Sequence, residues 1–410
     1  MPRCIYCTNP IDGSEQHIIP STIGGQWAPG HIVCAGCNHT LGDTLDKSIA
    51  ALFAELNNRL AITTGRNRLA GQVRQTSTEG VTYRVRPGGL PMPPKGNVSF
   101  DVRPHADGLG SDISARAPTE EMARDIIEQY AKKHNLILGS LTTEEQWSLL
   151  EPKFNVSMTL DASLLRTSTK IGFETLATKV YRDLITDERF DHIRAYIMDG
   201  RENSHLIAFI DDAPVQRETD AFDLVDHSVV VFCNEETHTA WASIILYGGL
   251  SVTVLLTDRW DSQSVGWEHR VDPLTGRMKT IPRTDIPEWD SEQIRERAAA
   301  RTPERITAHV EQAFTNIAPV VAVRFIVMLV KDAAERELRQ HVDVDGLGPV
   351  ADQAIVDIVE GVMESVVRAG VDITNAVEQL VQETVSEEIR SYVLRATNSR
   401  PPAATNPSSL

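Results

Sequence analysis

Residues 4–38 read CIYCTNPIDGSEQHIIPSTIGGQWAPGHIVCAGCN and contain two Cys-x-x-Cys pairs. Two residues between thiolates allow a tight turn to present both sulfurs to one ion, and two such turns complete a tetrahedral zinc site. The 26 residues between the pairs exceed the usual interval of about 15–20 residues, which leaves room for a hairpin. The spacing therefore predicts one structural zinc ion per chain, bound by Cys4, Cys7, Cys34 and Cys37.

Two other interpretations of these cysteines are disfavoured. Four unrelated buried cysteines would seldom form two such pairs within the first 37 residues of a chain that has only five cysteines. A redox-active pair is disfavoured because there are two pairs and neither lies in a βαβ pattern.

The segment between the pairs carries a second pattern, Ser14-Glu15-Gln16-His17-Ile18-Ile19-Pro20, followed by Ile23-Gly24-Gly25, with Asn38 directly after the last cysteine. In this combination, about residues 4–46 resemble the zinc-knuckle members of the HNH endonuclease family. The resemblance implies a ββα-metal module in which a histidine and a divalent metal ion hydrolyse phosphodiester bonds. His17 would be the general base, because an imidazole accepts a proton near neutral pH. Asn38 would help to hold the catalytic metal, and the zinc would be structural.

Three positions near the motif bear on the catalytic metal. The family usually has an acid before the histidine, whereas this chain has Gln16, and a neutral amide binds Mg²⁺ less well than a carboxylate. His31 and His39 are further candidates for the metal shell, and nitrogen ligands would favour Mn²⁺, Ni²⁺ or Zn²⁺ over Mg²⁺.

Each candidate also has a structural interpretation. His17 and His31 could be packing residues, and Asn38 could cap the following helix. A catalytically degenerate zinc-knuckle protein that binds nucleic acid or another protein is therefore the alternative to a metal-dependent nuclease.

Charge is distributed unevenly along the 410 residues, whose formal net charge is −17. From residue 47 to residue 103 there are nine basic and three acidic residues, a local net charge of +6. Arginine forks suit phosphate groups, so this stretch predicts contacts with a nucleic-acid backbone, with DNA the favoured substrate. The alternative is a solvated loop with scattered arginines. The candidate contacts are Arg66, Arg68, Arg74, Arg84 and Arg86.

The hydrophobic patterns predict an α+β multidomain protein. The predicted divisions are an HNH module with its following helix (1–60), a basic Gly/Pro-rich extension (61–105), an α+β domain (106–285), a helical domain (286–397) and a disordered tail (398–410). Helices are expected over 45–60, 119–134 and 168–184, and strands over 81–86, 206–210 and 228–232, with a hairpin over 241–256.

The α+β domain offers further titratable groups, whose structural interpretations are favoured. Asp211-Asp212, Glu235-Glu236 and His238 are more typical of turns and solvated loops than of a metal cluster, and Cys233 is typical of a buried thiol.

The remaining expectations concern location and partners. The N-terminus lacks the apolar region of a secretory signal, and the run 317–330 contains Pro319 and Arg324 and is too short to span a bilayer. We therefore expect a cytoplasmic protein without membrane contact. By analogy alone, a nuclease of this kind would serve bacterial defence or a mobile element. The apolar stripes of the C-terminal helices suit a homo-oligomer or a partner protein.

Overall fold

The computed structural model describes residues 3–64, 68–92, 99–105, 110–117, 120–139, 142, 152–154, 160–215, 225–285 and 287–340. The predictions for Arg66, for residues 341–397 and for the tail lie outside these residues.

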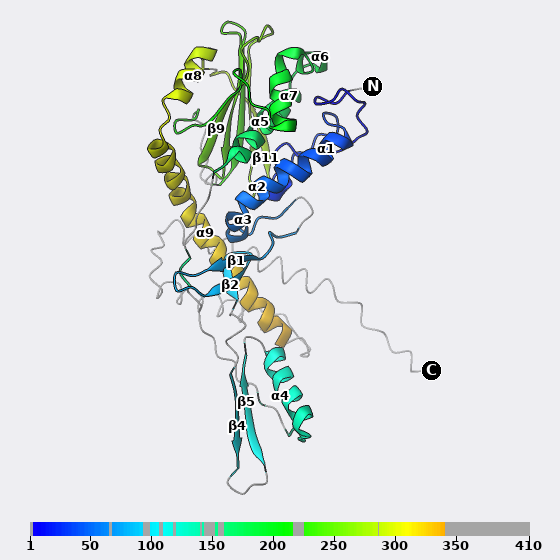
Figure 1. Ribbon diagram of the computed structural model, residues 1–410, viewed down its shortest axis with the longest axis vertical. Helices are drawn as coiled ribbons and strands as arrows, with labels where there is room; N and C mark the ends of the chain where they lie inside the picture. Colours follow the sequence, from blue (N-terminus) through cyan, green and yellow to red (C-terminus); the bar gives the residue numbers. More distant parts are fainter. Residues whose placement is uncertain are drawn as a thin grey trace, which may run out of the picture.

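A six-stranded antiparallel sheet with strand order β11-β10-β7-β8-β9-β6 lies at the centre of the fold (Figure 1). Strands β7, β8 and β9 are buried on both faces, which explains their near-continuous runs of β-branched and aromatic residues. The predicted hairpin is confirmed, because β8 and β9 are joined by a turn in which Tyr247 and Gly248 have φ of 50° and 70°. The strands are β6 (Ile207–Ile210), β7 (His227–Asn234), β8 (Thr239–Leu246), β9 (Leu250–Thr257), β10 (Val265–Val271) and β11 (Met278–Pro282).

Helices cover both faces of this sheet. Helix α5 (Ala162–Ala177) packs on one face, where a Cβ at Gly172 would lie 2.7 Å from the Cβ of Ala242, so only glycine allows this close approach. Helices α6 (Arg182–Ile185) and α7 (Asp191–Asp199) follow, with the short η3 (Glu188–Phe190) between them. Helix α8 (Ser291–Ala299) contributes Ile294 to a second apolar cluster on the other face.

The N-terminal segment is an irregular loop followed by a nearly continuous helical run. The run comprises α1 (Ala35–Leu41), a π-helical turn η2 (Gly42–Asp46), α2 (Lys47–Leu52) and α3 (Ala54–Arg59). The ββα arrangement implies a hairpin before α1, but the described residues 3–34 contain only an isolated bridge, the short η1 (Ser21–Ile23) and loops. Ile18 N donates to Trp27 O at 3.1 Å, and Pro20 and Pro29 lack the N–H groups that a longer ladder needs.

The N-terminal segment and the central sheet share one hydrophobic core. Side chains from Cys4 to Ile62 and from Leu164 to Val271 belong to the same buried cluster. Polar contacts cross the same boundary: His227 Nε2 donates to Ile23 O at 2.7 Å, and Tyr247 Oη donates to Asn57 Oδ1. In Figure 1 the blue helices accordingly lie against the green sheet and α5.

Two smaller β-structures follow α3. A three-stranded sheet consists of β1 (Val73–Thr76), β2 (Thr82–Arg86) and β3 (Leu90–Met92). A separate hairpin of β4 (Ser99–Pro104) and β5 (Ser111–Arg116) contacts α4 (Glu120–His134), which confirms the predicted helix to within one residue. In Figure 1 the hairpin and α4 lie at the end of the molecule remote from the central sheet.

The long helix α9 (Pro303–Gln340) runs from the central sheet to the three-stranded sheet. Its segment Pro303–Leu329 is long and apolar enough to cross a membrane, judged by length and composition alone. Residues 317–330, which were expected to be too short to span a bilayer, form only part of this helix, so the argument from length does not hold for α9. Val323, Ile326 and Val327 are buried against the protein body, and Arg324 Nε donates to Leu60 O at 3.0 Å, so the same composition also suits a packed helix.

Candidate functional site

The four cysteines of the two pairs meet at one point. Their Sγ atoms all lie within 4.8 Å of one another, and none forms a disulfide. Sulfurs bound tetrahedrally to zinc at about 2.3 Å would lie about 3.8 Å apart, so the group fits the ion. Crowding of the thiols lowers the pKa of Cys4 to about 4, chiefly through a hydrogen bond from Cys37, and raises the pKa of Cys37. All four could ionise together only around a cation.

His17 lies half-buried on the loop that leads away from the first cysteine pair. Its backbone carbonyl accepts hydrogen bonds from Gln16 Nε2 and from Lys170 Nζ, both at 2.9 Å. Burial, and next the positive charge of Lys170, lower the pKa of the His17 imidazole. The neutral ring that can accept a proton is therefore favoured at neutral pH.

Asn38 ties this loop to α1. Its Nδ2 donates to Ser14 Oγ at 2.6 Å and to Glu15 O at 3.1 Å. Asn38 lies in the first turn of the helix, whose N-cap is Cys34, so the capping interpretation is wrong. The carboxylate of Asp12 stabilises the helix N-terminus instead. Its two oxygens accept hydrogen bonds from Ala35 N at 3.1 and 3.2 Å.

The three other candidates for the catalytic-metal shell differ in their surroundings, and Gln16 is bonded to the backbone of His17. The Gln16 side chain is 1% exposed, and its buried Oε1 has no hydrogen-bond partner among the residues that the structure describes. His31 is exposed, and its carbonyl accepts from the guanidinium of Arg182. His39 is 81% exposed and lies 3.2 Å from Asp43.

The donor set for a catalytic metal is correspondingly sparse. Within the described residues, the four cysteines form the only group of three or more His, Cys, Asp or Glu side chains close enough to share an ion. Asn38 Oδ1 and the substrate's own phosphate oxygens would have to supply much of the coordination, a manner of binding that suits Mg²⁺.

The predicted basic contacts lie partly on the three-stranded sheet. Arg74 and Arg84 are direct cross-strand partners on β1 and β2, and both are exposed. Like charges opposite one another destabilise a sheet, and a bound anion would offset this repulsion. Arg68 is exposed on the preceding loop, and Arg86 is half-buried on β2.

The other titratable groups of the central region have structural partners. Asp211 accepts from Thr253, Arg297 and Arg301, and Asp212 is paired with Arg301 and Arg305. Glu235 N donates to Ser264 Oγ at 2.9 Å, Glu236 N donates to Asn234 Oδ1 at 2.8 Å, and His238 Nδ1 lies 3.0 Å from Trp260 O. Cys233 is buried, which raises the pKa of its thiol.

Sequence reasoning missed one group beside His17, which consists of Asp46, Lys170 and Glu174. Lys170 and Glu174 are both fully buried on α5. The available signal was an i, i+4 Lys–Glu pair on a helix face that also carries the small residues Thr167 and Ala177.

Comparison with known proteins agrees with this geometry at the N-terminus. The model of the HNH endonuclease family matches residues 4–53, which include the four cysteines, His17 and Asn38. Comparisons with curated proteins and with solved structures found no match. The N-terminal segment is thus an HNH endonuclease module, and its presence suggests a nuclease whose substrate is nucleic acid.

Proposed function

We propose that this protein is an endonuclease that hydrolyses phosphodiester bonds in nucleic acid, most simply DNA, with His17 as the general base. The observation that carries the proposal is the half-buried His17 within the matched segment, in surroundings that favour its neutral form. A neutral imidazole can take the proton of a water molecule as that water attacks phosphorus.

The neighbouring residues have distinct parts in this proposal. Asn38 and Asp12 hold the loop of His17 on α1, so the imidazole keeps a fixed direction. The zinc ion would hold the two cysteine turns together at one edge of the shared core, and it takes no part in the reaction. A divalent ion near Asn38 would stabilise the charge that develops on the phosphate and the leaving oxygen.

Substrate docking is assigned to the exposed arginines of β1 and β2. Arg74 and Arg84 together offer two guanidinium forks on one sheet face, which suits two phosphates of one backbone. Contacts of this kind hold nucleic acid without reading its sequence. A cytoplasmic location, a role in defence or in a mobile element, and self-association through the C-terminal region belong to the same proposal.

A plasmid-nicking assay tests the proposal. Wild-type protein should nick supercoiled plasmid in Mg²⁺, Mn²⁺ or Ni²⁺, and His17→Ala should lower the rate at least 100-fold, because general bases contribute about 10²–10⁴-fold. His205→Ala is the matched control, since His205 is an exposed histidine outside the matched segment, and it should keep the wild-type rate. Equal cleavage by His17→Ala and wild type would refute the role of His17.

One observation favours a second function, that of a degenerate zinc-knuckle module that binds nucleic acid without cutting it. Gln16 stands where the family has an acid, and its side-chain amide is buried and donates to the carbonyl of His17. Plasmid binding without nicking in all three metals would support this alternative.

A further inference from the structure

The ammonium group of Lys170 lies in a cage of four oxygen atoms directly behind His17. Its Nζ donates to His17 O at 2.9 Å and to Ile18 O at 3.2 Å, and it lies 3.4 Å from Glu174 Oε2 and 3.7 Å from Asp46 Oδ1. The two carbonyls and Asp46 come from the HNH module, whereas Lys170 and Glu174 come from α5. This four-oxygen cage joins segments that are 153 residues apart in the sequence.

A fully buried ammonium group requires this many oxygens. An unpaired buried charge costs several kcal/mol, and a lysine is almost never fully buried unless it is paired. Lys170 and Glu174 are both 0% exposed, and Asp46 is 20% exposed. Tyr6 Oη also donates to Glu174 Oε1 at 2.9 Å, so the carboxylate is held from the zinc side as well.

The cage fixes the backbone from which the His17 side chain leaves. Hydrogen bonds to the carbonyls of His17 and Ile18 hold two successive peptide groups, and the Cα of His17 lies in the plane of the first, so the chain on the C-terminal side of that Cα has little freedom. Helix α5 is itself anchored at Gly172 against Ala242 of β8, so its lysine is a rigid support.

We propose that Lys170 is a positioning residue for His17 and that the central α+β region thereby completes the nuclease site. This inference rests on the proposed function, and it assigns a role to a residue that lies outside the matched segment 4–53. Lys170 touches neither water nor phosphate in this role. It acts through the backbone of His17.

Replacement of Lys170 by methionine, which has a similar length and no charge, tests the role. Lys170→Met should lower kcat for plasmid nicking about 100-fold, the loss expected when a catalytic group is displaced by about 1 Å. KM and the salt dependence of plasmid binding should stay within twofold of wild type, because the arginines of β1 and β2 are untouched. One zinc ion per chain should remain.

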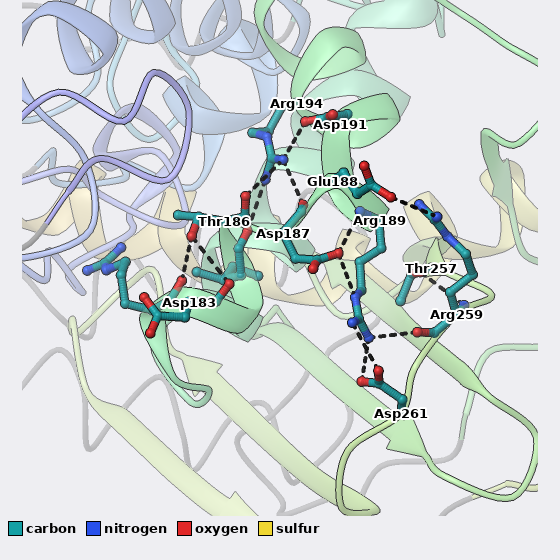
Figure 2. Close-up of polar contacts among 12 residues, drawn as sticks. Asp183, Thr186, Asp187, Glu188, Arg189, Asp191, Arg194, Thr257, Arg259 and Asp261 are labelled. Carbon is teal, nitrogen blue, oxygen red and sulfur yellow. Dashed lines mark hydrogen bonds and ion pairs between the residues drawn. The ribbon is translucent and has the colours of Figure 1, made fainter.

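The matched control is Arg189→Met, which removes a half-buried cation whose partners among the described residues are all remote from His17 in the sequence and have structural roles. Figure 2 shows Arg189 between Asp187 and Asp261, with Nη1 and Nη2 bound to the Asp261 carboxylate at 2.6 and 3.1 Å. Nη1 also donates to Arg259 O at 2.7 Å. This variant should lower stability and leave kcat unchanged below its unfolding temperature.

Chemical rescue separates a missing cation from a general packing defect. Lys170→Ala removes three carbons and the ammonium group, which is the shape of propylammonium. Added propylammonium should restore nicking at least tenfold in Lys170→Ala, whereas propanol should not, and neither should restore activity to His17→Ala. A Lys170→Met variant with kcat within threefold of wild type, or rescue by propanol as well, would overturn the inference.

A measurement that does not depend on cleavage distinguishes a failure of this inference from a failure of the proposed function. The NMR signal of the His17 Cε1–H group should shift and broaden in Lys170→Met and stay in place in Arg189→Met. An inactive wild-type protein would refute the proposed nuclease, but a His17 signal that is unchanged in Lys170→Met would refute the positioning role.

Discussion

Gln16 occupies the position at which the HNH resemblance calls for an acid, and its environment explains why a neutral amide is accommodated there. The Nε2 group donates to the carbonyl of His17, which a carboxylate cannot do. The same carbonyl already accepts from Lys170, and two carboxylates already face that lysine. A third acid in this interior would add charge without a new partner.

We therefore predict that Gln16→Glu destabilises the protein by about 1–3 kcal/mol at pH 8, the cost of an unsatisfied buried group. Burial raises the pKa of the introduced carboxyl, and its protonated form can donate to His17 O, so the loss should shrink as the pH falls toward 5. Urea unfolding of Gln16→Glu and of the apolar control Gln16→Met at both pH values measures the effect. A stable Gln16→Glu protein that cuts at lower Mg²⁺ would place position 16 on the metal instead.

At the level of single residues, the short motifs predicted the site residues that they contain, but no site residue elsewhere in the chain. The zinc cysteines follow from the spacing of the two pairs, and the four thiols do meet, whereas the roles of His17 and Asn38 follow from the family resemblance. Lys170 could not be predicted in the same way, because its partners are backbone carbonyls 153 residues away and carbonyls carry no sequence signature.

At the level of elements, the β1–β2 pair places two arginines side by side where a sheet alone would avoid them. If Arg74 and Arg84 each neutralise one phosphate, replacing both with alanine should reduce the slope of log affinity against log salt by about 1.8. Binding should weaken equally for unrelated DNA sequences. Fluorescence anisotropy with duplex DNA over a range of KCl concentrations measures both quantities.

Arg201 and Arg277 provide the control for this experiment, because they are also exposed arginines and lie outside the three-stranded sheet, each beside an aspartate. The Arg201→Ala Arg277→Ala variant should keep the wild-type slope. Equal slopes in both double variants would make the β1–β2 arginines ordinary solvated side chains.

Elements with clean periodicity were predictable, and elements with buried polar residues were not. The hairpin of β8 and β9 and strands β2, β6 and β7 follow from alternating or continuous apolar runs. Strand β10 was missed because Glu268, His269 and Arg270 stand in its interior, where Ser228 and Arg283 satisfy Glu268. Helix α5 begins at Ala162 and not at residue 168, because Asp161 accepts from Ser163 N and caps it.

At the level of the whole molecule, the HNH module and the central sheet are joined through one core and through the four-oxygen cage. Ile18, Ile19 and Ile23 belong to the same apolar cluster as Ile171 and Phe173. The sequence patterns alone suggested segments that end at residues 60 and 285, because core sharing between distant segments has no local signature.

Removal of zinc should therefore destabilise the central sheet as well as the module. We predict that chelation lowers by about 10 °C the unfolding temperature reported by fluorescence of the buried Trp241 and Trp260, since 1 kcal/mol corresponds to about 2–4 °C in a body of this size. Cys233→Ala, which leaves the zinc cysteines intact, should respond to the chelator in the same way as wild type. Loss of the module with an unchanged tryptophan transition would show that the two parts unfold independently.

The separation of His17 from Lys170 also sets the order in which the site matures during protein synthesis. A ribosome that adds about 5–20 residues per second needs roughly 8–30 s to make the 153 residues between them. Throughout that interval the nascent chain carries its histidine and cysteines but lacks the helix that closes behind them. Ribosomes that stall before α5, and messages that are cut short there, would release fragments with an unsupported histidine, so the producing cell would meet a supported histidine only on chains that extend past residue 177.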